Sequence, residues 1–76
     1  MNPRVKNVIP NNDYTLTITF TNDEVKVFDV KPYLQIGIFK ELKDLSLFNS
    51  VRPFMNSIQW INGQDLCPDT LYMESK

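Results

Sequence analysis

The sequence has no histidine, one cysteine and two glycines among its 76 residues. Without histidine, the chain lacks the commonest general base, the usual partner of a catalytic nucleophile and the commonest zinc ligand. Its cysteine, Cys67, can neither form an internal disulfide nor complete a structural zinc site. Gly37 and Gly63 are too far apart to form a glycine-rich phosphate loop. These absences predict a protein that is not an enzyme and binds no cofactor or metal.

The sequence also lacks a long apolar run. No segment approaches the roughly 20 apolar residues that cross a bilayer, and residues 1–6 contain no apolar stretch of the kind found in a secretory signal. A single cysteine fits a reducing compartment. We therefore expect a cytoplasmic protein with no membrane contact.

An excess of charge of one sign is missing as well. Eight Lys and Arg residues oppose nine Asp and Glu residues, giving a formal net charge of −1, and the two signs alternate along the chain. Strong attraction to nucleic acid is therefore not indicated. One alternative stays open, in which Lys6, Lys26 and Lys31 form a basic sheet face that binds phosphates.

What is present is typical of a small globular domain. Hydrophobic residues make up 42% of the chain and charged residues 22%. Residues 1–76 are long enough for one domain with one core. Because so small a core is only marginally stable, self-association into a homodimer would help by burying more apolar surface.

The N-terminal half predicts a three-stranded meander. Residues 5–9 form a short strand, and residues 14–20 alternate aromatic or aliphatic side chains with threonines, which predicts a strand with one buried face. Residues 21–24 read as a hairpin connection into a strand over residues 25–30.

A symmetric hairpin pairs Phe20 with Val25 and Ile18 with Val27, so that the apolar residues of both strands share one face. Phe28 then falls on the threonine face. Three explanations remain: a bulge that re-aims Phe28, another element that covers it, or a contact with a partner protein.

Short helices are predicted after the meander. Pro32 suits the first turn of a helix over residues 32–35, while residues 38–42 have no clear period and are left untyped. Asp44 is expected to cap a helix that runs through Val51 and ends before Pro53. Leu45 and Phe48 would form its inner side.

The C-terminal segment predicts a hairpin followed by a helix. Residues 57–61 form a strand, Asn62-Gly63 is a strong two-residue turn signal, and residues 64–66 return. Pro68 then begins a terminal helix. The expected fold class is α+β: a small antiparallel sheet, made of the N-terminal meander and the C-terminal Asn-Gly hairpin, with two or three short helices.

Two polar features accompany this helix. Asp65 and Asp69 could share a face as a catalytic pair, but we favour helix support, with Asp65 capping the N-terminus and Asp69 interacting with the helix dipole. Cys67 lies where thiol reactivity can rise, and we favour a small, half-buried packing role.

Aromatic and sulfur-containing side chains gather in the C-terminal part, at Phe54, Met55, Trp60 and Tyr72. Such clusters occur both in cores and in interfaces. We favour a place in the core for this cluster, because the chain has few other large side chains to bury.

The chain resembles the bacterial DUF2442 family. The resemblance runs from Arg4 to Tyr72, and its most specific part is the Trp-x-Asn-Gly-x-Asp-Leu-x-Pro-x-x-Leu-Tyr stretch that begins at Trp60. It implies a small α+β domain with no established catalytic residues. Some family members resemble the front half of proteins that end in a helix-turn-helix, and others resemble one partner of a toxin and antitoxin pair.

The chain ends at Lys76, before any helix-turn-helix, so the resemblance favours a protein partner over direct DNA recognition. The leading hypothesis is a non-catalytic protein-interaction or regulatory module, the antitoxin-like partner of a small protein encoded by a neighbouring gene. The alternative is a nucleic-acid-binding accessory, related to transcription, that uses the basic sheet face. The candidate interaction residues are Phe28, Trp60, Asn62, Asp65 and Tyr72.

Overall fold

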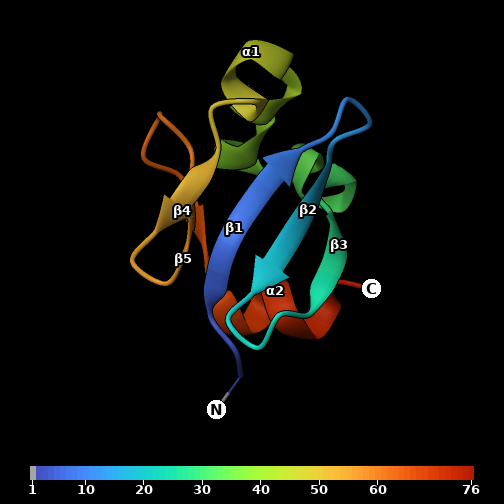
Figure 1. Ribbon diagram of the computed structural model, residues 1–76. Helices are drawn as coiled ribbons and strands as arrows, with labels where there is room; N and C mark the ends of the chain where they lie inside the picture. The colour runs from blue at the N-terminus through green and yellow to red at the C-terminus, as the bar shows by residue number, and fades with distance from the viewer. Residues whose placement is uncertain (1) are drawn as a thin grey trace.

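Two three-stranded antiparallel sheets form the framework of the fold (Figure 1). A computed structural model describes residues 2–76, apart from the side chain of Ile38. The first sheet has the order β1-β2-β3 and the second the order β4-β5-β6. Their bounds are β1 Val5–Pro10, β2 Thr15–Phe20, β3 Val25–Asp29, β4 Arg52–Phe54, β5 Ser57–Gln59 and β6 Asp65–Leu66.

Short helical segments complete the α+β fold. Two 3₁₀ helices follow β3, and two α-helices flank the second sheet along the chain. Their bounds are η1 Lys31–Gln35, η2 Gly37–Lys43, α1 Leu45–Phe48 and α2 Pro68–Glu74. Within the described residues, every helix falls short of the length and apolarity that a bilayer crossing requires. The predicted fold class, the meander and the C-terminal hairpin are confirmed.

The second sheet contains a strand that the sequence did not predict. β4 pairs with β5 through a two-residue turn at Met55 and Asn56, which places Phe54 opposite Ser57. Pro53 fits within β4 because this strand lies at a sheet edge, where a missing N–H is tolerated. The backbone N–H of Val5 donates to the carbonyl of Asn56, so the turn also joins the second sheet to β1.

The predicted register of β2 and β3 is wrong by one residue. Leu16 pairs with Phe28 and Thr17 with Val27, so Phe28 points into the core and is 1% exposed, whereas Val27 faces solvent. The shift arises in the turn, where the Phe20 N–H donates to the Glu24 carbonyl. The connection therefore has three residues instead of four, with Asp23 in the left-handed region at φ 69°.

The β5–β6 turn is also a three-residue turn that ends in a residue with positive φ. Its predicted two-residue loop is wrong, because the Trp60 N–H donates to the Gln64 carbonyl and Gly63 takes a φ of 88°. In both turns the middle residue is an asparagine, Asn22 or Asn62, whose side-chain oxygen accepts from the backbone N–H two residues on. Three-residue turns that end in a left-handed residue match the twist of a hairpin.

This shared geometry predicts opposite effects at the third turn position. Asp23→Gly should stabilise the domain by about 0.5–1 kcal/mol, because glycine adopts a positive φ without steric cost. Gly63→Ala should destabilise it by about 1 kcal/mol for the same reason. Urea unfolding of both variants provides the measurement. If both variants were more stable than the unchanged protein, or both less stable, the positive φ of Asp23 and Gly63 would be contradicted.

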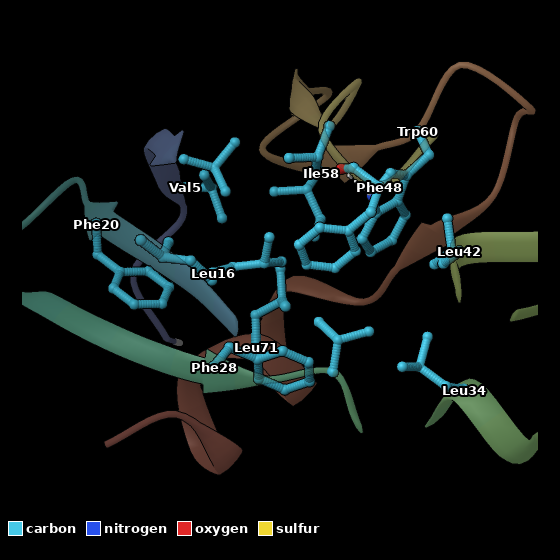
Figure 2. Close-up of a cluster of buried hydrophobic side chains, with 14 residues drawn as sticks. Val5, Leu16, Phe20, Phe28, Leu34, Leu42, Phe48, Ile58, Trp60 and Leu71 are labelled. Atoms are coloured by element: carbon cyan, nitrogen blue, oxygen red, sulfur yellow. Dashed lines mark hydrogen bonds between the residues drawn. The ribbon is translucent and has the colours of Figure 1, made fainter. Parts of the chain in front are cut away.

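The core lies between the inner face of the first sheet and the inner face of the second (Figure 2). Leu16, Ile18 and Phe20 of β2 are completely buried, as their alternation with threonine predicts. Trp60 is also completely buried, and its indole N–H donates to the Phe48 carbonyl at 3.0 Å. This bond satisfies the one polar atom of the Trp60 side chain.

The α1 helix begins as predicted but is shorter. The Asp44 carboxylate accepts from the backbone N–H of Ser46 at 2.9 Å, which confirms the cap. The helix ends at Phe48 instead of continuing to Val51. Phe48 is buried, but the inward prediction for Leu45 is wrong, because this side chain is 38% exposed.

Two tyrosine–glutamate hydrogen bonds fasten the C-terminal helix α2, one to the residue before β3 and one to η1. The Tyr72 hydroxyl donates to Glu24 at 2.5 Å, and the Tyr33 hydroxyl donates to Glu74 at 2.9 Å. Beyond the helix, the backbone N–H and carbonyl of Lys76 both bond to Val27 of β3. The end of the chain therefore covers part of the outer edge of this strand.

The Tyr72–Glu24 bond predicts an acid-sensitive contribution to stability. Hydrogen bonds from Tyr72 and then Asn22 hold the pKa of Glu24 below its ordinary value. A lowered folded-state pKa contributes stability above the ordinary value of 4.5, and this contribution is lost as the pH falls through the folded-state pKa. In Tyr72→Phe, the free energy of unfolding should therefore fall less steeply as the pH decreases, measured by urea unfolding between pH 3 and pH 7. The same pH dependence in the variant and the unchanged protein would contradict the prediction.

Candidate interaction surface

The five predicted interaction residues do not share one surface. Phe28 and Trp60 lie in the core, so neither presents its side chain to a partner in this structure. The half-buried Tyr72 ring packs edge-on against Phe20 and beneath Lys26. Asn62 bonds to Glu41 at 2.7 Å and to the Gln64 backbone at 3.0 Å. Among the five, only the exposed Asp65 presents a carboxylate on the surface.

Asp65 does not cap α2, contrary to the prediction. The N-cap is Cys67, which makes no side-chain capping bond. Asp69 lies in the first turn, as predicted, where its charge complements the helix dipole. Cys67 is an exposed free thiol, so the expected half-buried packing role is also wrong. Among residues 2–76 as described, no cluster of three or more acidic or thiol side chains could hold a metal ion.

The three lysines of the predicted basic face do not act together. Lys26 lies on the α2 side of the first sheet, with its ammonium 3.9 Å from the Tyr72 ring centre. Lys6 pairs with Asp23 at 3.3 Å, and Lys31 pairs with Asp29 at 3.4 Å. These carboxylates offset the positive charge that phosphate binding would need.

The solvent face of the first sheet is made largely of β-branched side chains. Ile9, Val25 and Val27 are 53%, 62% and 44% exposed, and the β2 threonines lie between them. Val25 and Val27 had been expected in the core, and the corrected register brings them to the surface. Ile9, Val25 and Val27 line neither of the two hollows described below.

The solvent face of the second sheet has more distinctive chemistry. Arg52 pairs with Gln59 across β4 and β5, and Gln59 pairs with Asp65 across β5 and β6. Residues directly opposite one another in an antiparallel sheet lie on the same face. The three side chains therefore form one row, positive, neutral and negative. We call this surface the β4–β6 face.

Arg52 is a candidate interaction residue that could not be identified from the sequence. Its guanidinium lies 5.2 Å from the Phe54 ring centre and donates to the Gln59 side-chain oxygen at 3.4 Å. Within the described part of the chain it forms no ion pair, in contrast to Lys6, Lys26 and Lys31. The sequence held no signal for it, because its position depends on the unpredicted strand β4.

Two hollows flank the row. One, of about 380 Å³, is lined by Arg52, Gln59 and Ile61, among others. The second, of about 300 Å³, is lined mainly by residues near the other end of the strands, including Phe54 and Pro68. Their rims carry exposed apolar side chains. Those of Phe54, Met55 and Ile61 are 38%, 81% and 77% exposed.

Met55 is held in a strained conformation at the edge of this surface. Its φ is 48° and that of Asn56 is 71°, as a two-residue hairpin turn of this type requires. Asparagine tolerates a positive φ, whereas methionine does so at a steric cost. The aromatic and sulfur cluster predicted from the sequence is therefore divided: Trp60 belongs to the core, while Phe54 and Met55 lie on the surface.

The fold and this face define a small α+β domain whose most distinctive surface is a charged row bordered by apolar side chains. The chain belongs to the DUF2442 family, described as proteins of unknown function, and the family model matches residues 5–76. Comparison with curated proteins and with solved structures gives no match.

Proposed function

We propose that this domain is a non-catalytic protein-interaction module that binds its partner through the β4–β6 face. The observation that carries the proposal is Arg52, which has no ion-pair partner among the described residues and lies on a surface with exposed phenylalanine, methionine and isoleucine side chains. Arginine, aromatic residues and methionine are enriched in protein interfaces, and arginine is frequent among the residues that dominate binding energy.

The conformation of Met55 supports the same surface. A large side chain at positive φ costs stability, and such strain tends to occur at functional sites. Here it holds an 81% exposed thioether at the rim of a hollow. Thioethers adapt readily to varied apolar surfaces, which suits recognition of a protein partner.

Some members of the family resemble one partner of a toxin and antitoxin pair, and this resemblance suggests the biological setting. The module would act as a regulatory, antitoxin-like partner of a small protein encoded by a neighbouring gene. The predicted basic sheet face gives nucleic-acid binding less support, because Lys6 and Lys31 pair with carboxylates and Lys26 stacks on Tyr72.

Co-purification with the neighbouring gene product tests this proposal. Arg52→Glu should reduce the recovered complex by about tenfold or more, the loss expected when a dominant interface residue is reversed in charge. Lys40→Glu is the matched control, because it makes the same charge change at an exposed residue that lines neither hollow. The complex is then rebuilt from purified components. Equal recovery with both variants would contradict the proposal.

A further inference from the structure

We infer that the β4–β6 face binds a second copy of this chain as a two-fold homodimer in which Arg52 of each copy pairs with Asp65 of the other. The inference rests on the proposed function, because it uses the same face, and it names a second copy of the chain as an occupant that would compete there with the neighbouring gene product. Its basis is the order of charges in the row, which is self-complementary: positive at Arg52, neutral at Gln59 and negative at Asp65.

The geometry of the row fixes the symmetry. Neighbouring strands lie about 4.8 Å apart, so Arg52 and Asp65 stand roughly 10 Å apart with Gln59 between them. A two-fold axis parallel to β5, passing over Gln59, places Arg52 opposite Asp65 of the second copy. The same rotation places Asp65 opposite the second Arg52. Two ion pairs form, with the two Gln59 amides facing each other at the centre.

The apolar groups fit the same axis. The rotation places the β4 side of one copy over the β6 side of the other. Phe54 then faces the part of the 300 Å³ hollow that is lined by Leu66, Cys67 and Pro68. Aromatic residues and arginine are enriched in protein interfaces, and residues that dominate binding energy tend to fill well-packed pockets near the interface centre.

The first sheet does not offer a comparable row of charges among the described residues. On the first sheet, Lys6 and Lys31 already pair with Asp23 and Asp29 of the same chain. In the part of the chain that the structure describes, Arg52 and Asp65 both lack an ion-pair partner. Pairing them between copies satisfies both charges at once.

The size of the face predicts a weak dimer. Fourteen residues line the two hollows, whereas an interface of standard size uses about 20–30 residues and about 800 Å² on each side. For this chain, 800 Å² is about a sixth of its accessible surface of 4567 Å². We therefore expect dissociation constants in the range of about 10–500 µM, typical of small interfaces.

Charge reversal provides the test, with sedimentation equilibrium of purified protein from about 10 µM to 1 mM. Arg52→Glu and Asp65→Arg should each weaken dimerisation by about tenfold or more, because each places like charges opposite one another twice. The double variant should recover dimerisation. An equimolar mixture of the two single variants should also dimerise, since every cross-copy pair is then opposite in charge. Lys40→Glu should dimerise like the unchanged chain.

Milder variants keep the test informative if a reversed charge impairs folding. Arg52→Gln and Asp65→Asn remove one charge each, and both should weaken dimerisation in protein that circular dichroism shows to be folded. A monomer at 1 mM would overturn the inference, as would a dimer indifferent to all four changes. If that monomer still binds another protein in a manner that depends on Arg52, the proposed function stands and only the homodimer fails. If neither binding depends on Arg52, both fail.

Discussion

Replacing Trp60 with alanine is expected to remove a large part of the protein's stability, about 3–5 kcal/mol, because the side chain is completely buried. At roughly 0.05–0.15 kcal/mol per residue, a chain of 76 residues has a total stability of only about 4–11 kcal/mol. The loss also leaves the Phe48 carbonyl without the indole donor that it accepts at 3.0 Å.

Trp60→Phe separates the two contributions. It keeps most of the apolar volume but removes the indole N–H, and should cost about 1–3 kcal/mol, less than alanine. Urea unfolding followed by circular dichroism is the suitable measurement, because Trp60 is the only tryptophan and both variants lose its fluorescence. An alanine variant within 1 kcal/mol of the unchanged protein would show that Trp60 is not a core residue.

Substitutions at two adjacent residues of β3 should differ greatly in their effect on stability. Phe28→Ala is expected to lower the free energy of unfolding by about 3–5 kcal/mol, because Phe28 is 1% exposed and packs near the Tyr33 ring. Val27→Thr should change it by no more than about 0.5 kcal/mol. The side chain of Val27 faces solvent, and its backbone bonds to Lys76 are unaffected.

This pair of variants discriminates directly between the two registers. The symmetric hairpin would bury Val27 and expose Phe28, whereas the three-residue turn reverses them. Thermal unfolding monitored by circular dichroism suffices, since the expected difference corresponds to many degrees in a domain of this size. A larger loss at Val27 than at Phe28 would restore the symmetric register.

Local signals predicted the strands and the α1 cap well. The alternation along β2 identified its buried face, because strand side chains repeat every two residues. Asp44 was recognisable because capping involves only neighbouring residues. The registers were not predictable in this way. They depend on whether Asp23 and Gly63 adopt a positive φ within a three-residue turn, and asparagine-containing turns of either length have similar compositions.

The candidate surface could not be predicted from the sequence, for a related reason. Met55 and Asn56 lack the glycine that usually marks a two-residue hairpin, so β4 gave no signal. Without β4, Arg52 could not be placed beside Gln59. Asp65 was identified as a candidate, but only the three-strand register shows which charges share its face.

The two backbone hydrogen bonds between Val27 and Lys76 allow the docking of the chain end to be measured by hydrogen exchange. The Val27 amide bonds outward to Lys76, whereas the neighbouring strand β2 lies on the opposite side of β3. Exchange of the Val27 amide proton with deuterium therefore requires only release of the last residues, not opening of the sheet. Comparing this rate with that of the core amide of Ile18 would separate the free energy of docking the chain end from that of global unfolding.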